Sequence, residues 1–447
     1  MTGRTKLALC CVVLVLAGCS SAPVDTATTT DGVATTEPVS KPTDSAATTE
    51  SGATTTESPS ENVPTLESVS INESRVLERT KRLLGGGEFP KFGVGVQQYS
   101  ASDTRQVEIP FEFTQAFGVP NATTERELWT DGTALYQSNS VNLRLSNRST
   151  AREVRAVLVH EYAHLMIIQY KSFVQNVRPP TRRIIDEGSA TFVAQQYAER
   201  YGNTLPNQDV YCEIYENGTA AERLKLGAYC EGARYIDGRV DDPANIETVY
   251  ENPPNTTEQV RHGYLPGEEP PVDLAVNATD GNGWYLDDRE RQGELWTYAV
   301  LSTHLSDTRA DQAATGWDND TRLTYTSSGE ESYAWVTRWD SPADADEFAT
   351  AMRAHAANAT AGSATNAKFD VERVNETIVV VLVGEEAFVR KITVTATDTA
   401  VVVDPSASAT NSTATERAVG PAMVVESTLT PHPESYQVVS LATGRGQ

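Results

Sequence analysis

Apolar and polar positions change their spacing several times along the chain, and each change predicts a different element. Apolar residues at intervals of three and four in "ESRVLERTKRLLGG" (73–86) predict a helix that ends at glycine. The alternation in "FGVGVQQY" (92–99) and in "ALYQSNSVNLRL" (134–145) predicts strands. Helical spacing then dominates residues 150–200 and returns at 293–307, "GELWTYAVLSTHLSD".

Alternation returns from about residue 320 onwards. "RLTYTS", "ESYAWVTRW", "ETIVVVLVG" and "AFVRKITVTA" predict four strands, and "PADADEFATAMRAH", from Pro342 to His355, predicts a helix among them. The sequence therefore predicts an α+β fold, with upstream strands and two packed helices followed by a mixed, β-rich C-terminal part. We expect residues 66–305 and 306–403 to form one unit.

The N-terminal residues predict an export signal. Arg4 and Lys6 precede eleven apolar residues, "LALCCVVLVLA", a length too short to span a bilayer but typical of a signal peptide. The following "LAGC" resembles the lipobox of lipoproteins. The resemblance implies that residues 1–18 are removed and that Cys19 anchors the protein to the outer face of the cytoplasmic membrane. A plain secretory signal is the alternative.

Two segments lack the composition of a folded core. Residues 19–65 are rich in Ser and Thr and contain no aromatic residue, Leu or Ile. Such a segment buries too little apolar surface to offset its ordering entropy, so we expect a disordered tether. Residues 404–447 begin with a similar composition and predict a loose tail.

The charge balance excludes some partners. Acidic residues outnumber basic residues 61 to 36, which gives a formal net charge of −25. Such a surface repels nucleic acids and anionic lipid head groups, so the membrane is expected as a partner only through the lipid anchor. Arginine (28) far exceeds lysine (8). This composition resembles proteins of halophilic archaea; an ordinary acidic secreted protein is the alternative.

Two further features fit an exported protein. Outside the cell, Cys212 and Cys230 should form a disulfide, because closing their loop contributes about 3 kcal/mol and no nearby histidine pair makes them a zinc site. Asn-X-Ser/Thr sequons, which mark glycosylated surfaces, begin at Asn72, Asn121, Asn147, Asn217, Asn255, Asn277, Asn319, Asn358, Asn375 and Asn411.

The most specific motif lies in "VLVHEYAHLMIIQY" (157–170), which contains His160-Glu161-Tyr162-Ala163-His164. Four residues turn a helix by about 400°, so His160 and His164 share a face and both imidazoles can reach one ion. Glu161 lies about 100° round the helix, where it can touch a metal-bound water without being a ligand. The alternative is a pair of core histidines on a buried helix.

A third metal ligand is expected from "IIDEGSATFVAQQY" (184–197). Pro179 and Pro180 interrupt the first helix, and a second helix can begin near Thr181. Small residues on the face of Glu187 allow close packing against the first helix, so Glu187 is our candidate ligand. Asp186 is the alternative ligand, or a second-shell acceptor for a ligand histidine.

The HExxH motif followed by "EGSA" (187–190) resembles the gluzincins, which are thermolysin-like zinc peptidases. The metzincin pattern, HExxHxxGxxH, is absent because residues 167 and 170 are Ile and Tyr. The resemblance implies Zn²⁺ held by His160, His164 and Glu187. It also implies that Glu161 activates a zinc-bound water whose pKa falls towards about 7, and that it later protonates the leaving amine.

Gluzincins also use a His or Tyr to stabilise the tetrahedral oxyanion. His262 is our candidate, on a short helix that Thr256 and Gln259 would cap. Tyr250 and Tyr264 are alternatives. Asp318 and Asp320 are interpreted as a solvated turn rather than a cation site. His304 is interpreted as a packing residue, and His355 and His432 as residues in polar surroundings without a role.

"TTEQVRHGYLPGE" (256–268), "GWDND" (316–320) and "WDSPADADEF" (339–348) resemble a poorly characterised group of exported HExxH proteins of bacteria and haloarchaea. The sequence therefore predicts a cell-surface lipoprotein that acts as a zinc metallopeptidase on a peptide or protein substrate. The main alternative is a non-catalytic, zinc-stabilised scaffold or binding protein. A solute-binding lipoprotein would share the anchor but has no use for HExxH.

Overall fold

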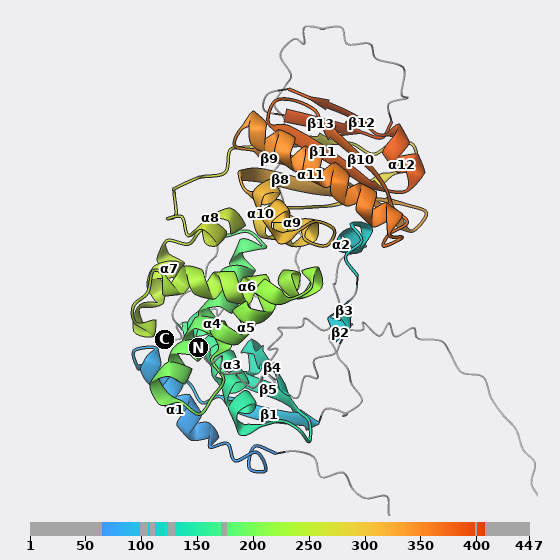
Figure 1. Ribbon diagram of the computed structural model, residues 1–447. Coiled ribbons are helices and arrows are strands. Elements are labelled where there is room, and N and C mark those ends of the chain that lie inside the picture. The colour runs from blue at the N-terminus through green and yellow to red at the C-terminus, as the bar shows by residue number, and fades with distance from the viewer. Residues whose placement is uncertain are drawn as a thin grey trace, which may run out of the picture. The chain divides into compact units, whose positions relative to one another are not determined.

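The computed structural model describes residues 65–98, 106–107, 112–120, 122–123, 130–170, 177–397 and 400–406, which belong to one unit (Figure 1). The predicted signal peptide with Cys19, the tether up to residue 64 and the tail beyond residue 406 lie outside these residues. Within the described part of the chain, no helix is long and apolar enough to cross a membrane.

The N-terminal region contains a three-stranded sheet in the order β1-β5-β4. Its strands are β1 (Gly93–Gln98), β5 (Ser140–Leu145) and β4 (Thr130–Leu135). β1 runs parallel to β5, and β4 runs antiparallel to β5. β5 alternates buried and half-buried residues, as its sequence predicts, and β4 is left as an edge strand beside helix α3 (Ala151–Tyr170).

Helices make up most of the rest of this region. They are α1 (Glu73–Leu83), α3, α4 (Thr181–Tyr201), α5 (Asn207–Asn217), α6 (Ala220–Asp237), α7 (Glu247–Glu251) and α8 (Thr257–His262), with 3₁₀ turns at Tyr136–Ser138 and Pro243–Asn245. α4 packs against both α3 and α6, which places it at the centre of the helical layer. One hydrophobic cluster joins these helices to the sheet.

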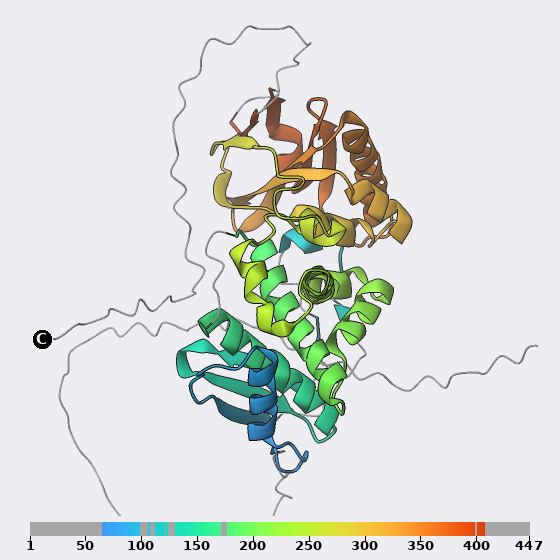
Figure 2. The same cartoon turned by 90° about the vertical axis from the view of Figure 1, so that its left-hand side faces the viewer.

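The C-terminal region is built on a five-stranded antiparallel sheet in the order β10-β11-β9-β8-β7. Its strands are β7 (Tyr285–Glu290), β8 (Trp317–Ser327), β9 (Glu330–Trp339), β10 (Lys368–Arg373) and β11 (Ile378–Gly384). Both faces are covered. Helices α9 (Gly293–Leu301), α10 (Asp307–Ala314) and α11 (Pro342–Ala361) pack on one face (Figure 2).

The opposite face packs on α12 (Glu386–Lys391) and on a second, three-stranded sheet in the order β12-β13-β6. That sheet contains β12 (Thr393–Ala396), β13 (Ala400–Asp404) and β6 (Ala275–Ala278). Because successive side chains of a strand point to opposite faces, a strand covered on both sides reads as a continuous apolar run. This explains "IVVVLV" in β11, where every residue is buried.

A short segment from the N-terminal half of the sequence belongs to the core of the C-terminal region. Helix α2 (Glu112–Ala116) lies between β1 and β4 in sequence, next to the two-residue strands β2 (Gln106–Val107) and β3 (Ala122–Thr123). Phe113 stacks on Trp296, with ring centroids 4.8 Å apart, and Phe117 meets Trp335 edge to face. Figure 1 shows α2 beside the sheet of the C-terminal region.

The α+β fold predicted from the sequence is confirmed. One predicted strand is partly wrong, because "AFVRKITVTA" forms helix α12 before it forms β12. The helix predicted over 293–307 ends at Leu301, and the helix predicted from Pro342 to His355 continues to Ala361.

Candidate metal centre

The motif helix α3 is held at its start by a reciprocal cap. The Thr150 backbone N–H donates to Glu153 Oε2 at 2.9 Å, and the Glu153 N–H donates to Thr150 Oγ1 at 3.4 Å. The apolar residues that flank the motif are buried on all sides, so the histidines enter the core rather than the surface.

The second helix comes close because it contains glycine at the crossing point. A Cβ atom on Gly188 would lie 2.4 Å from the carbonyl carbon of Gly232 on α6, and a Cβ on Gly232 would lie 2.3 Å from Ile184 O. Glycine is required at both positions, because a side chain at either one would keep α4 and α6 from approaching so closely. Gly188 follows Glu187 directly, so this contact fixes the height at which Glu187 faces α3.

The two helices bring three predicted ligands together. His160 Nε2 and His164 Nε2 lie 3.0 Å apart, and Glu187 Oε2 lies 3.3 Å and 3.2 Å from them. All three side chains are buried. Within the described part of the chain, these residues form the one group of three or more His, Cys, Asp or Glu side chains whose ligand atoms could hold a metal ion.

The spacing of the three atoms fits a tetrahedral ion. With bonds of about 2.0–2.1 Å, two ligand atoms of a tetrahedral Zn²⁺ site lie about 3.3 Å apart. A proton on an imidazole nitrogen serves these contacts one at a time, because each ring nitrogen carries at most one N–H. A cation among the three atoms is bound by all of them at once. The donor set and its spacing therefore fit zinc.

Glu161 lies beside this group without being part of it. Its side chain is fully buried, and neither carboxylate oxygen makes a hydrogen bond of good geometry with a described residue; the Ala134 backbone N–H approaches closely enough to lower its pKa against the effect of burial. The edge strand β4 passes directly over it, since a Cβ on Gly132 would lie 2.9 Å from Glu161 Cγ and 2.4 Å from Val157 Cγ1. Gly132 leaves the space in which the carboxylate fits.

Burial and neighbouring charges act in opposite directions on the protonation of this centre, and burial prevails only at Glu161 and His160. Burial raises the pKa of Glu161 to about 8, even though His164 nearby acts in the opposite direction. Burial lowers the pKa of His160 to about 4. Burial alone would also raise the pKa of Glu187, but His164 and His160 hold it well below its ordinary value. The centre therefore contains one carboxylate that favours its neutral form and one that favours its charged form.

One ring contact of this centre is not evident from the sequence motifs. The ring of Tyr229, on α6, stacks on His160 with centroids 5.7 Å apart and an interplanar angle of 21°. The next residue, Cys230, forms the predicted disulfide with Cys212 of α5, which is confirmed (Sγ–Sγ 2.03 Å). Gly132 lies outside the strand predicted over 134–145, although it belongs to β4, so the predicted pattern carried no signal for its approach to Glu161.

Asp186 and Tyr250 lie next to the group. Asp186 forms an ion pair with Arg182 at 3.7 Å, and burial raises the pKa of Asp186 to about 6. The Nδ1 atoms of His160 and His164 have no hydrogen-bond partner among the described residues, so the second-shell role of Asp186 stays a prediction. The Tyr250 hydroxyl donates to Ser189 Oγ at 3.0 Å and lies near Asp186 and Glu187.

His262 makes its contacts elsewhere. The predicted cap of its helix is present, since the Gln259 N–H donates to Thr256 Oγ1 at 3.1 Å. His262 Nε2 lies 2.9 Å from Glu294 Oε1, and its ring stacks on Tyr264 at 5.4 Å. Its role as an oxyanion donor therefore stays a prediction, and of the three candidates Tyr250 has the described contacts next to Glu187.

Two interpretations of polar residues are wrong. Asp318 and Asp320 do not form a solvated turn: both are buried on β8. Asp320 accepts hydrogen bonds from the backbone N–H groups of Gln292 and Gly293 and from Trp317 Nε1. His355 is also fully buried, with its Nε2 2.9 Å from Phe117 O. His432 lies outside the described residues.

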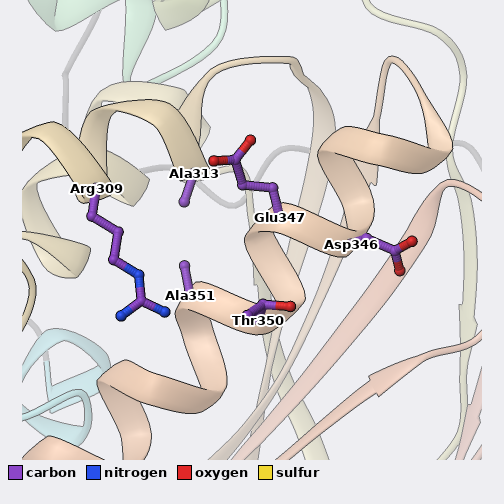
Figure 3. Close-up of a pocket in the computed structure, with 6 residues that line it drawn as sticks. All are labelled: Arg309, Ala313, Asp346, Glu347, Thr350 and Ala351. Atoms are coloured by element: carbon purple, nitrogen blue, oxygen red, sulfur yellow. The ribbon is translucent and has the colours of Figure 1, made fainter.

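A shallow pocket occurs in the C-terminal region, between α10 and α11 (Figure 3). Arg309 reaches into it from α10, and Glu347 and Thr350 border it on α11. None of the predicted site residues lines it.

Comparison with known proteins adds little about function. Residues 285–414 match the model of a domain of unknown function, DUF8575, which covers less than half of the chain and does not include the candidate metal centre. No curated protein and no solved structure matches the chain.

Proposed function

We propose that this protein is a zinc-dependent peptide hydrolase of the cell surface. The observation that supports this most directly is the buried triangle of His160 Nε2, His164 Nε2 and Glu187 Oε2, with sides of 3.0–3.3 Å. These three atoms would hold Zn²⁺. When bound, zinc supplies a Lewis acid that polarises a scissile carbonyl and makes water acidic near neutral pH.

Glu161 is the general base of the proposed reaction. It is not needed as a ligand, and its carboxylate oxygens make no hydrogen bond of good geometry with a described residue, so they are available to an attacking water. In this role one carboxylate oxygen takes a proton from the water and later delivers it to the leaving amine.

The oxyanion needs a further donor, and the contacts favour Tyr250 over His262. The Tyr250 hydroxyl lies among Ser189, Asp186 and Glu187, whereas His262 is paired with Glu294. β4 offers an edge strand beside Glu161, where an extended peptide can lie.

One observation favours the second candidate function, a non-catalytic zinc-stabilised scaffold. His160 and Glu161 are both fully buried, and His164 and Glu187 are nearly so. A structural zinc site is closed, whereas a catalytic site keeps one position open to substrate.

Glu161→Gln separates the two candidates. The amide keeps the size of the side chain but cannot accept a proton, so we expect hydrolysis of a peptide panel to fall by about 10²–10⁴-fold or more, with zinc retained. Glu153→Gln is a matched control, because it makes the same change in a buried glutamate of the same helix. Wild-type protein that holds zinc and cleaves nothing would favour the scaffold.

The cellular location is proposed separately. Lipid attachment at Cys19 would hold the folded unit at the membrane surface, and Cys19→Ser should release it or leave its signal peptide uncleaved. Wild-type protein found wholly in the medium, with its N-terminus beyond Cys19, would contradict the anchor and leave the hydrolase proposal intact.

A further inference from the structure

The chain contains more glycosylation sequons than its asparagine content suggests. Ten of its 20 asparagines begin an Asn-X-Ser/Thr sequon, and eight of the ten lie within the described residues. A glycan is bulky and needs a surface position, so we take as requirements a free amide nitrogen and an accessible hydroxyl on the third residue. The structure sorts the eight by these two requirements and by the backbone conformation of the sequon.

Four sequons fail at the amide nitrogen. Asn319 is buried on β8, and its Nδ2 donates to Val272 O at 2.7 Å. The other three donate from Nδ2 to backbone oxygens at 2.8–3.0 Å: Asn217 to Glu213, Asn358 to His304 and Asn375 to Thr397.

Two more sequons fail because of their surroundings. Asn255 is exposed, but its third residue, Thr257, is buried and accepts a hydrogen bond from the Leu295 N–H at 3.3 Å. Asn72 caps α1 through its side-chain oxygen, so the rest of its sequon is wound into the first turn of that helix.

Among the eight, Asn277 and Asn147 are the two exposed asparagines whose sequon lies outside a helix and whose third residue is not buried. Asn277 lies on β6, an edge strand that pairs only with β13 in its sheet, and Thr279 beyond it is also exposed, with its hydroxyl donating to Asp404 Oδ1 at 3.3 Å. Asn147 lies in the turn before α3, where the Ser149 N–H donates to Ser146 O and the half-buried Ser149 Oγ accepts from the Ser146 N–H at 2.9 Å. Neither side-chain amide has a hydrogen-bond partner among the described residues.

We propose that Asn277 and Asn147 are glycan acceptors, a proposal that rests on the predicted export of the chain. The donor is an oligosaccharide carried on a polyprenyl phosphate. Nδ2 of the asparagine forms a bond with the anomeric carbon of the first sugar while the bond from that carbon to the phosphate oxygen breaks. The phosphate leaves with the lipid, and Nδ2 loses one proton.

A glycan on Asn277 would also cover an apolar residue. β6 and β13 place Asn277 directly beside Val402, which is one of the larger exposed hydrophobic side chains of the molecule. A sugar attached at this register position would shield Val402 from solvent and separate the edge of this short sheet from other chains.

Glycopeptide mass spectrometry of the full chain, purified from its own cells, tests the proposal. We expect glycan mass on the peptides that contain Asn277 and Asn147 and none on the peptide that contains Asn319. Thr279→Val should remove the glycan at Asn277 alone, and Thr279→Ser should keep it, since serine also supplies the hydroxyl. The modification at Asn147 serves as the internal control in both variants.

Unmodified asparagine at both positions in the wild-type protein would overturn the proposal, and a glycan on Asn319 would overturn the structural criterion. Neither result depends on zinc or on hydrolysis, so the outcome is separate from that of the proposed function.

Discussion

Glu161 in the N-terminal region and Asp320 in the C-terminal region are both deeply buried carboxylates, but their surroundings differ. Asp320 accepts three hydrogen bonds, two from backbone N–H groups and one from Trp317. Glu161 makes none of good geometry with the described residues, with only the Ala134 backbone N–H near it, and lies beside two histidines and another glutamate. A satisfied buried carboxylate stabilises a fold, whereas an unsatisfied one indicates a position kept for a ligand or a reaction.

The same contrast holds for the histidines. His355 in the C-terminal region places its Nε2 on a backbone carbonyl, Phe117 O. His160 and His164 direct their Nε2 atoms at each other and at Glu187. Residue type and burial alone do not distinguish a packing histidine from a candidate metal ligand. The hydrogen-bond partner of each Nε2 atom distinguishes them.

The largest expected effect tests the structural half of this comparison. Asp320→Ala would leave two buried donors, the Gly293 N–H and Trp317 Nε1, unpaired at about 1–3 kcal/mol each, together with the half-buried Gln292 N–H. We expect the free energy of unfolding to fall by about 3–6 kcal/mol, measured by chemical denaturation. Asp287→Ala, an exposed aspartate on β7, is the control and should change it by less than about 0.5 kcal/mol. A small effect at Asp320 would remove the contrast with Glu161.

The next effect concerns the contact of α2 with the C-terminal region. Phe117 is fully buried among aromatic rings, so Phe117→Ala should lower the free energy of unfolding by about 3–5 kcal/mol. Tyr285→Ala, at an exposed aromatic residue, should have little effect. If Phe117→Ala leaves stability unchanged, α2 is not part of the C-terminal core in solution.

The disulfide should matter somewhat less. Removing the Cys212–Cys230 bond, which closes a loop with a sequence separation of 18, should lower the free energy of unfolding by about 3 kcal/mol. The measurement compares wild type with the double Cys→Ser variant, with and without reductant. Reductant should destabilise wild type alone. Equal stability of both proteins would show that the packing of α5 on α6 is sufficient without the bond.

The smallest expected effect depends on pH. Burial lowers the pKa of His355 to about 4, and the neighbouring His304 adds to that shift. Because the unfolded chain binds this proton more tightly, stability falls as the pH drops from about 6.5 towards 4. Between pH 7 and 5.5 we expect a loss of about 1 kcal/mol in wild type, reduced in His355→Gln. An unchanged pH dependence in that variant would contradict the assignment.

The sequence predicted the grouping of His160, His164 and Glu187 better than the surroundings of that group. The spacing of His160 and His164 is a local property of one helix, and the helix start near Thr181 followed from Pro179 and Pro180. The approach of Gly132 to Glu161 and the stacking of Tyr229 on His160 join segments far apart in sequence, which local patterns do not encode.

The burial of His355 could be predicted from the spacing of apolar residues on its helix. Phe348, Met352 and His355 recur at intervals of four and three on α11, and all three are buried. That spacing predicts one inward face. The polar and small residues around His355 make the pattern weak in the sequence. α12 is a different case, because "EAFVRK" contains one β-branched residue, Val389, among good helix formers, whereas "ITVTA" after it is rich in β-branched residues. Taking the whole run as one strand missed this change.

We propose that His160, His164 and Glu187 hold one zinc ion beside a base, Glu161, that is not a ligand. The most direct measurement is the zinc content of purified wild type, Glu187→Gln and Glu161→Gln after dialysis, each with its peptidase activity. We expect one zinc per chain in wild type and in Glu161→Gln, little zinc in Glu187→Gln, and activity in wild type alone. Full zinc retention in Glu187→Gln, or equal activity in Glu161→Gln, would contradict the account.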